Sequence, residues 1–197
     1  GVGNASVIKV DTNCANGFTG RFRAAATVGD NLTTIQFRNM QFIRAATTFF
    51  EQQYQLWFDT GTNIVVDSCT FTGWSGDAII IGNILNNTTS AWLQSICDNI
   101  KITNCVFDGV NKDNRNAISV FSGTNIEIAG NFFKNTSRSD MPGAIDLEPE
   151  LVTNVIENIS IHDNTFTNIG GYVGVIGCAL FVNLKTRDQN IYIYDKL

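Results

Sequence analysis

The sequence predicts an all-β fold in which short parallel strands stack coil upon coil, a parallel β-solenoid. Two observations lead to this prediction. A nine-residue pattern recurs along the chain at intervals of 26 to 36 residues, and a second short apolar strand precedes each copy. Because the pattern is constant while the intervals vary, we expect fixed strands joined by loops of different lengths. Helical periodicity is missing. We therefore expect one domain over residues 1–197, with about six coils of 26–36 residues.

The recurring pattern begins with Asn, continues with alternating apolar β residues and closes with Phe. Its copies begin at these residues: Thr34 (a weaker copy), Asn63, Asn99, Asn125, Asn158 and Asn190 (an unfinished copy). Equal positions of stacked coils lie about 4.8 Å apart and form ladders through the interior. We expect one aliphatic ladder, one of cysteine and amide side chains, and one aromatic ladder. Their members are Ile64, Ile100, Ile126 and Ile159, then Cys69, Cys105, Asn131 and Asn164, then the closing phenylalanines.

The strand that precedes each pattern is a short run of apolar residues, in most copies opened by Ala. These strands are expected at 56–59, 78–82, 117–121, 144–148 and 179–183. Successive side chains of a strand point to opposite faces. In the segment 144–148 the alternation therefore points Ile145 and Leu147 inward, and Asp146 and Glu148 outward. Both ends of the sequence fall inside a coil, so we expect the 197 residues to be part of a longer chain.

Composition and charge exclude several classes of protein. The formal net charge of −5 disfavours nucleic acid and anionic membranes as partners. No apolar run is long enough for a transmembrane helix, so we expect no membrane insertion. The cysteines are odd in number and form no CxxC pair, which argues against a disulfide framework, a zinc site or any other metal site. We expect no cofactor, and free thiols in a chain made in a reducing cytosol; the cysteines are Cys14, Cys69, Cys97, Cys105 and Cys178.

Several motifs resemble a known superfamily. They are the opening Gly-x-Gly-x-x-x-Val-Ile-Lys-Val, the Asn-Ile-x-Ile-x-x-Asn-x-Phe copies, and the segments 76–79 and 143–150. They look like the pectate-lyase-like superfamily of single-stranded, right-handed parallel β-helices, and within it most like bacteriophage tailspike and tail-appendage proteins. The resemblance covers nearly the whole chain. It implies a homotrimer of the virion tail, made in the host cytoplasm, whose partner is a bacterial surface polysaccharide.

The resemblance implies a fold more strongly than a reaction, because this scaffold carries lyases, hydrolases, epimerases and adhesins. The motif set of polygalacturonases is absent, and the single histidine, His162, has no Gly-His-Gly context and is expected at the surface or in a turn. The calcium-binding carboxylates and arginine base of pectate lyases and the Asp-Pro-His pattern of alginate epimerases are also missing. Glycoside hydrolysis in the style of phage depolymerases is therefore favoured over a lyase reaction. Two alternatives stay open: a non-enzymatic receptor-binding or adhesion module, and a structural spacer.

The sharpest candidate for catalysis is the acidic segment that contains Asp146, Glu148 and Glu150. Two residues along a strand separate Cβ atoms by about 6.6 Å. Carboxyl groups roughly 6.5–9.5 Å apart are what an inverting glycosidase uses, one to protonate the leaving oxygen and one to activate water. Crowding of acids also raises a pKa and favours a general acid. The same segment fits sugar or ion binding, a solvated strand end, or an interface.

The outward columns beside these acids are the candidate substrate-binding face. They contain Trp57, Asp59, Ser119, Phe121, Phe181 and Asn183. Aromatic rings stack on sugar faces, and carboxylates and amides bind sugar hydroxyls. The alternative is that the outward apolar residues pack against loops or a neighbouring subunit. The loops 83–98 and 108–116, which include Trp92, Asp113 and Arg115, are longer than a corner needs and are second-choice contact regions. Asp77, which precedes the strand at 78–82, is interpreted as a residue that caps a turn.

Overall fold

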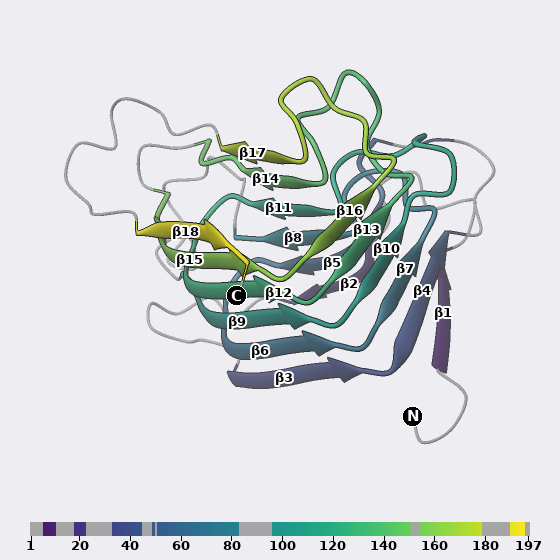
Figure 1. Ribbon diagram of the computed structural model, residues 1–197. Helices are drawn as coiled ribbons and strands as arrows, with labels where there is room; N and C mark the ends of the chain where they lie inside the picture. The colour runs from purple at the N-terminus through teal and green to yellow at the C-terminus, as the bar shows by residue number, and fades with distance from the viewer. Residues whose placement is uncertain are drawn as a thin grey trace.

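The computed structural model describes residues 6–10, 18–22, 33–44, 49, 51–82, 96–150, 154–178 and 190–195. Over these residues the chain forms strands that assemble into three parallel sheets, here called A, B and C (Figure 1). Consecutive strands enter sheets A, B and C in turn, so three strands complete one circuit. No helix is present in the described segments, and hence none that could cross a membrane. The predicted all-β architecture of stacked parallel strands is therefore confirmed.

Each sheet contains six strands. Sheet A consists of β1 (Ser6–Val10), β4 (Met40–Arg44), β7 (Thr70–Thr72), β10 (Val106–Asp108), β13 (Phe132–Lys134) and β16 (Thr165–Thr167). Sheet B consists of β2 (Phe18–Phe22), β5 (Tyr54–Phe58), β8 (Ile79–Ile81), β11 (Ile118–Val120), β14 (Ile145–Leu147) and β17 (Ile176–Cys178). Sheet C consists of β3 (Thr33–Arg38), β6 (Gly61–Asp67), β9 (Cys97–Thr103), β12 (Gly123–Ala129), β15 (Ile156–His162) and β18 (Ile191–Tyr194).

The register of sheet C confirms the predicted aliphatic ladder. Ile100 of β9 pairs with Ile64 below it and with Ile126 above it, and Ile126 in turn pairs with Ile159. All four side chains are buried in the space that the three sheets enclose. Alternation along each strand places these residues inward and their neighbours outward. The two-residue alternation in the sequence therefore predicts which side chains enter the interior.

The predicted nine-residue pattern is divided between two strands of different sheets. The chain turns from sheet C into sheet A at Asn104, Gly130 and Asp163, whose φ angles are 54°, 66° and 54°. Asn, Asp and Gly accept this left-handed backbone more readily than other residues. The Asn that opens the pattern has the same backbone, and Asn99 Nδ2 donates to Asn63 Oδ1 at 2.6 Å. Asn, Asp and Gly thus occupy these corners, and apolar residues form the walls.

The interior holds the two other predicted ladders. The rings of Phe71, Phe107 and Phe133 stack with centroids 4.9 and 4.8 Å apart and nearly parallel planes. Such close ring stacking adds to the area that each phenylalanine buries. In the cysteine and amide column, Cys105 N–H donates to Asn131 Oδ1 at 2.9 Å, and Asn131 N–H donates to Asn164 Oδ1, also at 2.9 Å. Buried polar atoms of this column therefore pair from coil to coil.

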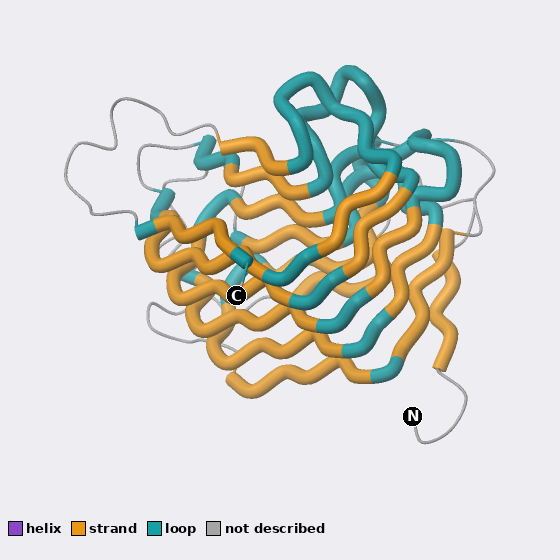
Figure 2. Tube along the Cα trace, in the orientation of Figure 1, coloured by secondary structure: helices purple, strands orange, loops and turns teal. Residues whose placement is uncertain are grey.

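Four of the five cysteines lie in the described residues. Cys69, Cys97 and Cys105 are free and buried, whereas Cys178 is free and exposed. Cys14 lies outside the described residues. The connections from sheet A to sheet B gather at one corner of the molecule (Figure 2). Those described in full are residues 73–78, 109–117, 135–144 and 168–175, and they lead directly into the strands of the candidate site.

One predicted strand is wrong in register. The sequence pattern placed a sheet B strand at 179–183, but the strand that pairs with β14 is Ile176–Cys178. Ala179 resembles the alanines that precede β8, β11 and β14, yet Val175 takes their position, because its carbonyl accepts from Ala144 N–H at 3.0 Å. Phe181 and Asn183 consequently do not continue the columns expected of them, and both lie outside the described residues.

Candidate functional site

The candidate catalytic segment lies on sheet B, with Asp146 in the middle of β14. Its register partners are Ser119 on β11 and Gly177 on β17. Ile80 of β8 and Trp57 of β5 continue the same column away from β17. The register thus brings Trp57, Ser119 and Asp146 into one column, as the strand alignment predicts.

Gly177 occupies the position that the sequence assigned to Phe181. A Cβ atom built on Gly177 would lie 2.9 Å from Asp146 Oδ1, closer than real Cβ contacts allow. A phenylalanine could not take this position without displacing the carboxylate. The glycine therefore allows β17 to cover Asp146 closely.

The expected open, sugar-binding face is closed. The exposed fractions of its predicted members are 3% for Trp57, 0% for Asp59, 0% for Ser119 and 3% for Phe121. The outward apolar side chains contact one another, and Trp57 Nε1 donates to the Gly82 carbonyl at 2.9 Å. The reason is the hydrophobic effect, because large outward rings lower the free energy by packing together. Rings buried in this way are not free to stack on a sugar.

The three predicted catalytic acids form a series from the interior to the surface. Asp146 is 1% exposed, Glu148 is half-buried and Glu150 is exposed. Glu148 remains in line with sheet B, because its N–H donates to the Val120 carbonyl at 2.9 Å. A single side chain of the series, that of Glu148, therefore borders both the buried cluster and the solvent.

Glu148 holds its proton unusually strongly. Burial, the charge of Asp146 and a side-chain hydrogen bond with Asp146 raise the pKa of Glu148 to about 7. Burial raises the pKa of Asp146 as well, although its hydrogen bond with Glu148 acts in the opposite direction. Two carboxyl groups joined by a hydrogen bond share one proton, as neighbouring acids do when both cannot ionise.

This hydrogen bond corrects the separation expected for the two acids. The spacing of their Cβ atoms suggested a gap of about 6.6 Å that a water molecule could enter. The side chains instead lean together, so Asp146 and Glu148 do not form the separated pair of an inverting glycosidase. Glu148 and Glu150 remain as the pair that borders solvent, and burial together with the charge of Glu148 raises the pKa of Glu150.

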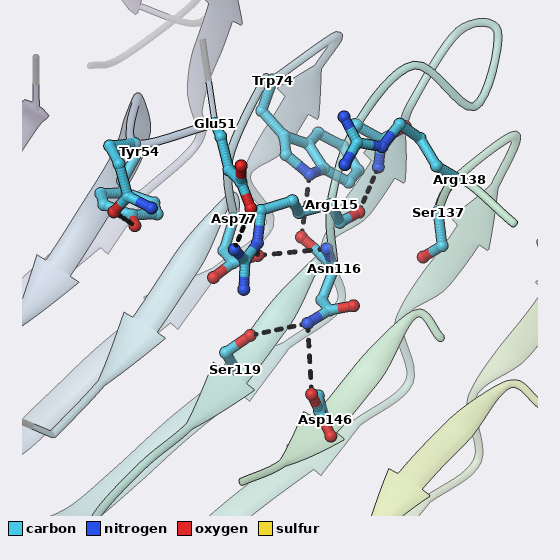
Figure 3. Close-up of polar contacts among 12 residues, drawn as sticks. Glu51, Tyr54, Trp74, Asp77, Arg115, Asn116, Ser119, Ser137, Arg138 and Asp146 are labelled. Carbon is cyan, nitrogen blue, oxygen red and sulfur yellow. Dashed lines mark hydrogen bonds and ion pairs between the residues drawn. The ribbon is translucent and has the colours of Figure 1, made fainter. Parts of the chain in front are cut away.

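A polar network connects the acids to the corner between sheets A and B (Figure 3). Asp77, 1% exposed, lies 3.4 Å from Arg115 Nε and accepts a hydrogen bond from Asn116 N–H at 3.1 Å. Burial outweighs these favourable contacts and raises the pKa of Asp77 to about 6. Arg115 also pairs with Glu51 at 2.8 Å, while Asn116 Nδ2 reaches Asp146 Oδ2 at 3.4 Å.

Asp77 and Asn116 are the site residues that sequence reasoning missed or undervalued. Asp77 was interpreted as a turn-capping residue, Arg115 only as part of a long loop, and Asn116 was not singled out. A signal was present, because Asp77 and Asn116 each directly precede the alanine that opens a sheet B strand. Equal positions of successive coils stack, so these two residues had to lie together. Of the second-choice loops, residues 83–95, with Trp92, lie outside the described segments.

The described residues contain no group of three or more His, Cys, Asp or Glu side chains that could hold a metal ion. His162, expected at the surface, is 5% exposed and lies between two carboxylates: Nδ1 is 2.8 Å from Asp163 Oδ2, and Nε2 is 3.4 Å from Glu127 Oε1. Tyr194 stacks on its ring at 4.9 Å. This histidine lies on sheet C, away from the acids of sheet B.

Comparison with known proteins gives no relative. No family model, no curated protein and no solved structure matches the chain.

Proposed function

We propose that this protein recognises and depolymerises a bacterial surface polysaccharide by glycoside hydrolysis, with Glu148 as the general acid. The proposal includes a single-stranded right-handed β-helix of about six coils, acting as a homotrimer in a phage tail. The observation that carries it is the half-buried Glu148 carboxyl, whose pKa is raised to about 7 by burial and by Asp146. An acid that still holds its proton near neutral pH can protonate a leaving oxygen.

The reaction assigns a different task to each acid. Glu148 transfers its proton to the glycosidic oxygen while the bond from that oxygen to the anomeric carbon breaks. Glu150, the exposed acid of the series, accepts a proton from the water that attacks the anomeric carbon. Asp146 stays buried and keeps the proton of Glu148 in place. One water is consumed, and its hydroxyl forms the new bond to the anomeric carbon. Glu148 ends ionised and Glu150 protonated, and proton exchange with the solvent returns both acids to their starting states.

The first experiment follows polymer length. Capsular and wall polysaccharides are incubated with the protein, and new reducing ends are measured together with the molar mass of the polymer. We expect Glu148→Gln to lower the rate about 100-fold or more, because a general acid contributes at least that much. Asp98→Asn on sheet C is the matched control and should keep full activity, because Asp98 lies on a different sheet. A fully active Glu148→Gln protein would remove this site from consideration.

A second candidate function involves no cleavage: the protein is either a receptor-binding module or a spacer of the appendage. The burial of Trp57, Asp59, Ser119 and Phe121 favours the spacer, since these side chains serve packing rather than an open subsite. Binding that saturates while the polymer keeps its length would support the adhesion module. Neither binding nor cleavage, over a broad set of glycans, would support the spacer.

A further inference from the structure

Asn116 is fixed by its backbone at the centre of the polar network. Its carbonyl accepts from Trp74 Nε1 at 2.9 Å, and its N–H donates to Asp77 Oδ1 at 3.1 Å. The residue is 0% exposed. Figure 3 shows its side chain extending from this anchored backbone toward Ser119 and Asp146. These contacts fix the backbone of Asn116, so only the orientation of its side-chain amide is left to be determined by the neighbouring side chains.

The amide of Asn116 is oriented by its donor end. Nδ2 donates to Ser119 Oγ at 3.1 Å and to Asp146 Oδ2 at 3.4 Å. Oδ1 is buried and has no hydrogen-bond partner. An unpaired buried carbonyl is unfavourable, so this orientation persists only if the opposite one is worse. Turning the amide over would place Oδ1 against the Asp146 carboxyl, which can donate to it only when Asp146 itself carries a proton.

The two orientations of this amide therefore correspond to two positions of one proton. With Nδ2 toward Asp146, the carboxylate accepts, and the proton shared by the two acids belongs on Glu148. With Oδ1 toward Asp146, the proton would belong on the buried acid and be withheld from solvent. The structure has the first arrangement.

We propose that Asn116 is a positioning residue that directs its amide N–H at Asp146 and thereby keeps the shared proton on Glu148, the acid that borders solvent. The position of the proton can be measured whether or not the protein is an enzyme. Its catalytic consequence rests on the proposed hydrolysis by Glu148. Other charged or titratable groups act on the pair from the neighbouring elements, and none of them is substituted in the variants below: Asp77, Arg115, Glu150 and Cys178.

The test is a ¹³C NMR titration of the Asp and Glu carboxyl carbons in the full chain, assigned with Glu148→Gln and Asp146→Asn. In the wild-type protein we expect Glu148 to titrate near pH 7 and Asp146 at lower pH. The reverse order would overturn the proposal without any variant. In Asn116→Leu, which removes the donor at similar volume, the Glu148 midpoint should fall by one pH unit or more, and that of Asp146 should rise.

Ser119→Ala is the matched control, because it removes the other partner of Nδ2 and leaves the donation to Asp146 possible. The variant also removes the hydrogen bond of Ser119 with Asp77, so the Asp77 carboxyl is followed in the same titration. The titration midpoint of Glu148 in Ser119→Ala should stay within about 0.3 pH units of the wild-type value, because the amide still donates to Asp146. A shift of that size is roughly a twofold change in the acid dissociation constant of Glu148. An unchanged midpoint in a folded Asn116→Leu protein would contradict the proposal. If wild type cleaves no glycan, the proposed function fails while the titration still decides the position of the proton.

Discussion

Replacing Asp77 by Asn tests the electrostatics of the site through protein stability. Asp77 is buried, and its pKa is raised from 3.8 to about 6 although Arg115 Nε is 3.4 Å away. A group with a raised pKa in the folded state adds stability that is complete below the pKa of the unfolded state. That stability is lost as the pH rises through the folded pKa. The shift of about two pKa units corresponds to about 3 kcal/mol.

Urea unfolding of wild type and Asp77→Asn at pH 4 and pH 8 measures this effect. Asn keeps the oxygen that accepts from Asn116 N–H and carries no charge at either pH. We expect the unfolding free energy of wild type to fall relative to the variant by up to about 3 kcal/mol between pH 4 and pH 8. Other acids of the site titrate in both proteins and largely cancel in this difference.

Two results would refute this prediction: a difference in unfolding free energy between wild type and Asp77→Asn that does not change with pH, or a wild-type protein that becomes more stable relative to the variant as the pH rises. Either result would mean that attraction to Arg115 outweighs the burial of Asp77. Asp98→Asn supplies an internal control of opposite sign. A hydrogen bond from Thr124, supported by one from Asn125, lowers the pKa of Asp98. The stability that ionised Asp98 contributes is present above the pKa that Asp98 has in the unfolded state, and it is lost as the pH falls. Wild type should therefore lose stability relative to Asp98→Asn in acid.

Three further predictions concern the solenoid. Phe107→Ala should lower the unfolding free energy by about 4 kcal/mol in urea denaturation, because Phe107 is fully buried. Phe166 is only half-buried, so Phe166→Ala should lower it clearly less, and equal losses would contradict an interior stack. Asn125→Ala should be about 1 kcal/mol less stable than Asn125→Gly, because its φ of 54° suits a residue without Cβ; equal stabilities would argue against a left-handed corner. Asn131→Leu leaves Cys105 N–H unpaired and should cost about 2 kcal/mol by thermal unfolding, whereas a stabilised variant would show that the column does not need the amide.

The ladders were predictable because stacking turns a sequence repeat directly into a spatial one. The register of Ile64, Ile100 and Ile126 follows from equal positions in successive copies of one pattern. The same reasoning failed at residues 179–183, where Ala179 imitates the position that Val175 takes. The short strand Ile176–Cys178 contains a glycine, which hides the apolar alternation on which strand assignment depends.

The chemistry of the site was less predictable, because alternation gives the direction of a side chain and not what covers it. Asp146 and Trp57 point away from the enclosed core, as expected, yet both are buried. Gly177 lies against Asp146, and Trp57 bonds to the Gly82 carbonyl, and neither contact is visible in the local pattern. The pairing of Asp146 with Glu148 depends on side-chain rotamers, which spacing along a strand does not determine.

The most direct test of hydrolysis by Glu148 is the pH dependence of kcat/KM on a polysaccharide that the protein cleaves, measured from pH 5 to pH 9. If Glu148 donates its proton to the leaving oxygen, kcat/KM falls about tenfold per pH unit once the pH exceeds about 7, the pKa of that carboxyl. A value of kcat/KM that stays level from pH 7 to pH 9 would contradict the account, because an ionised Glu148 has no proton to give.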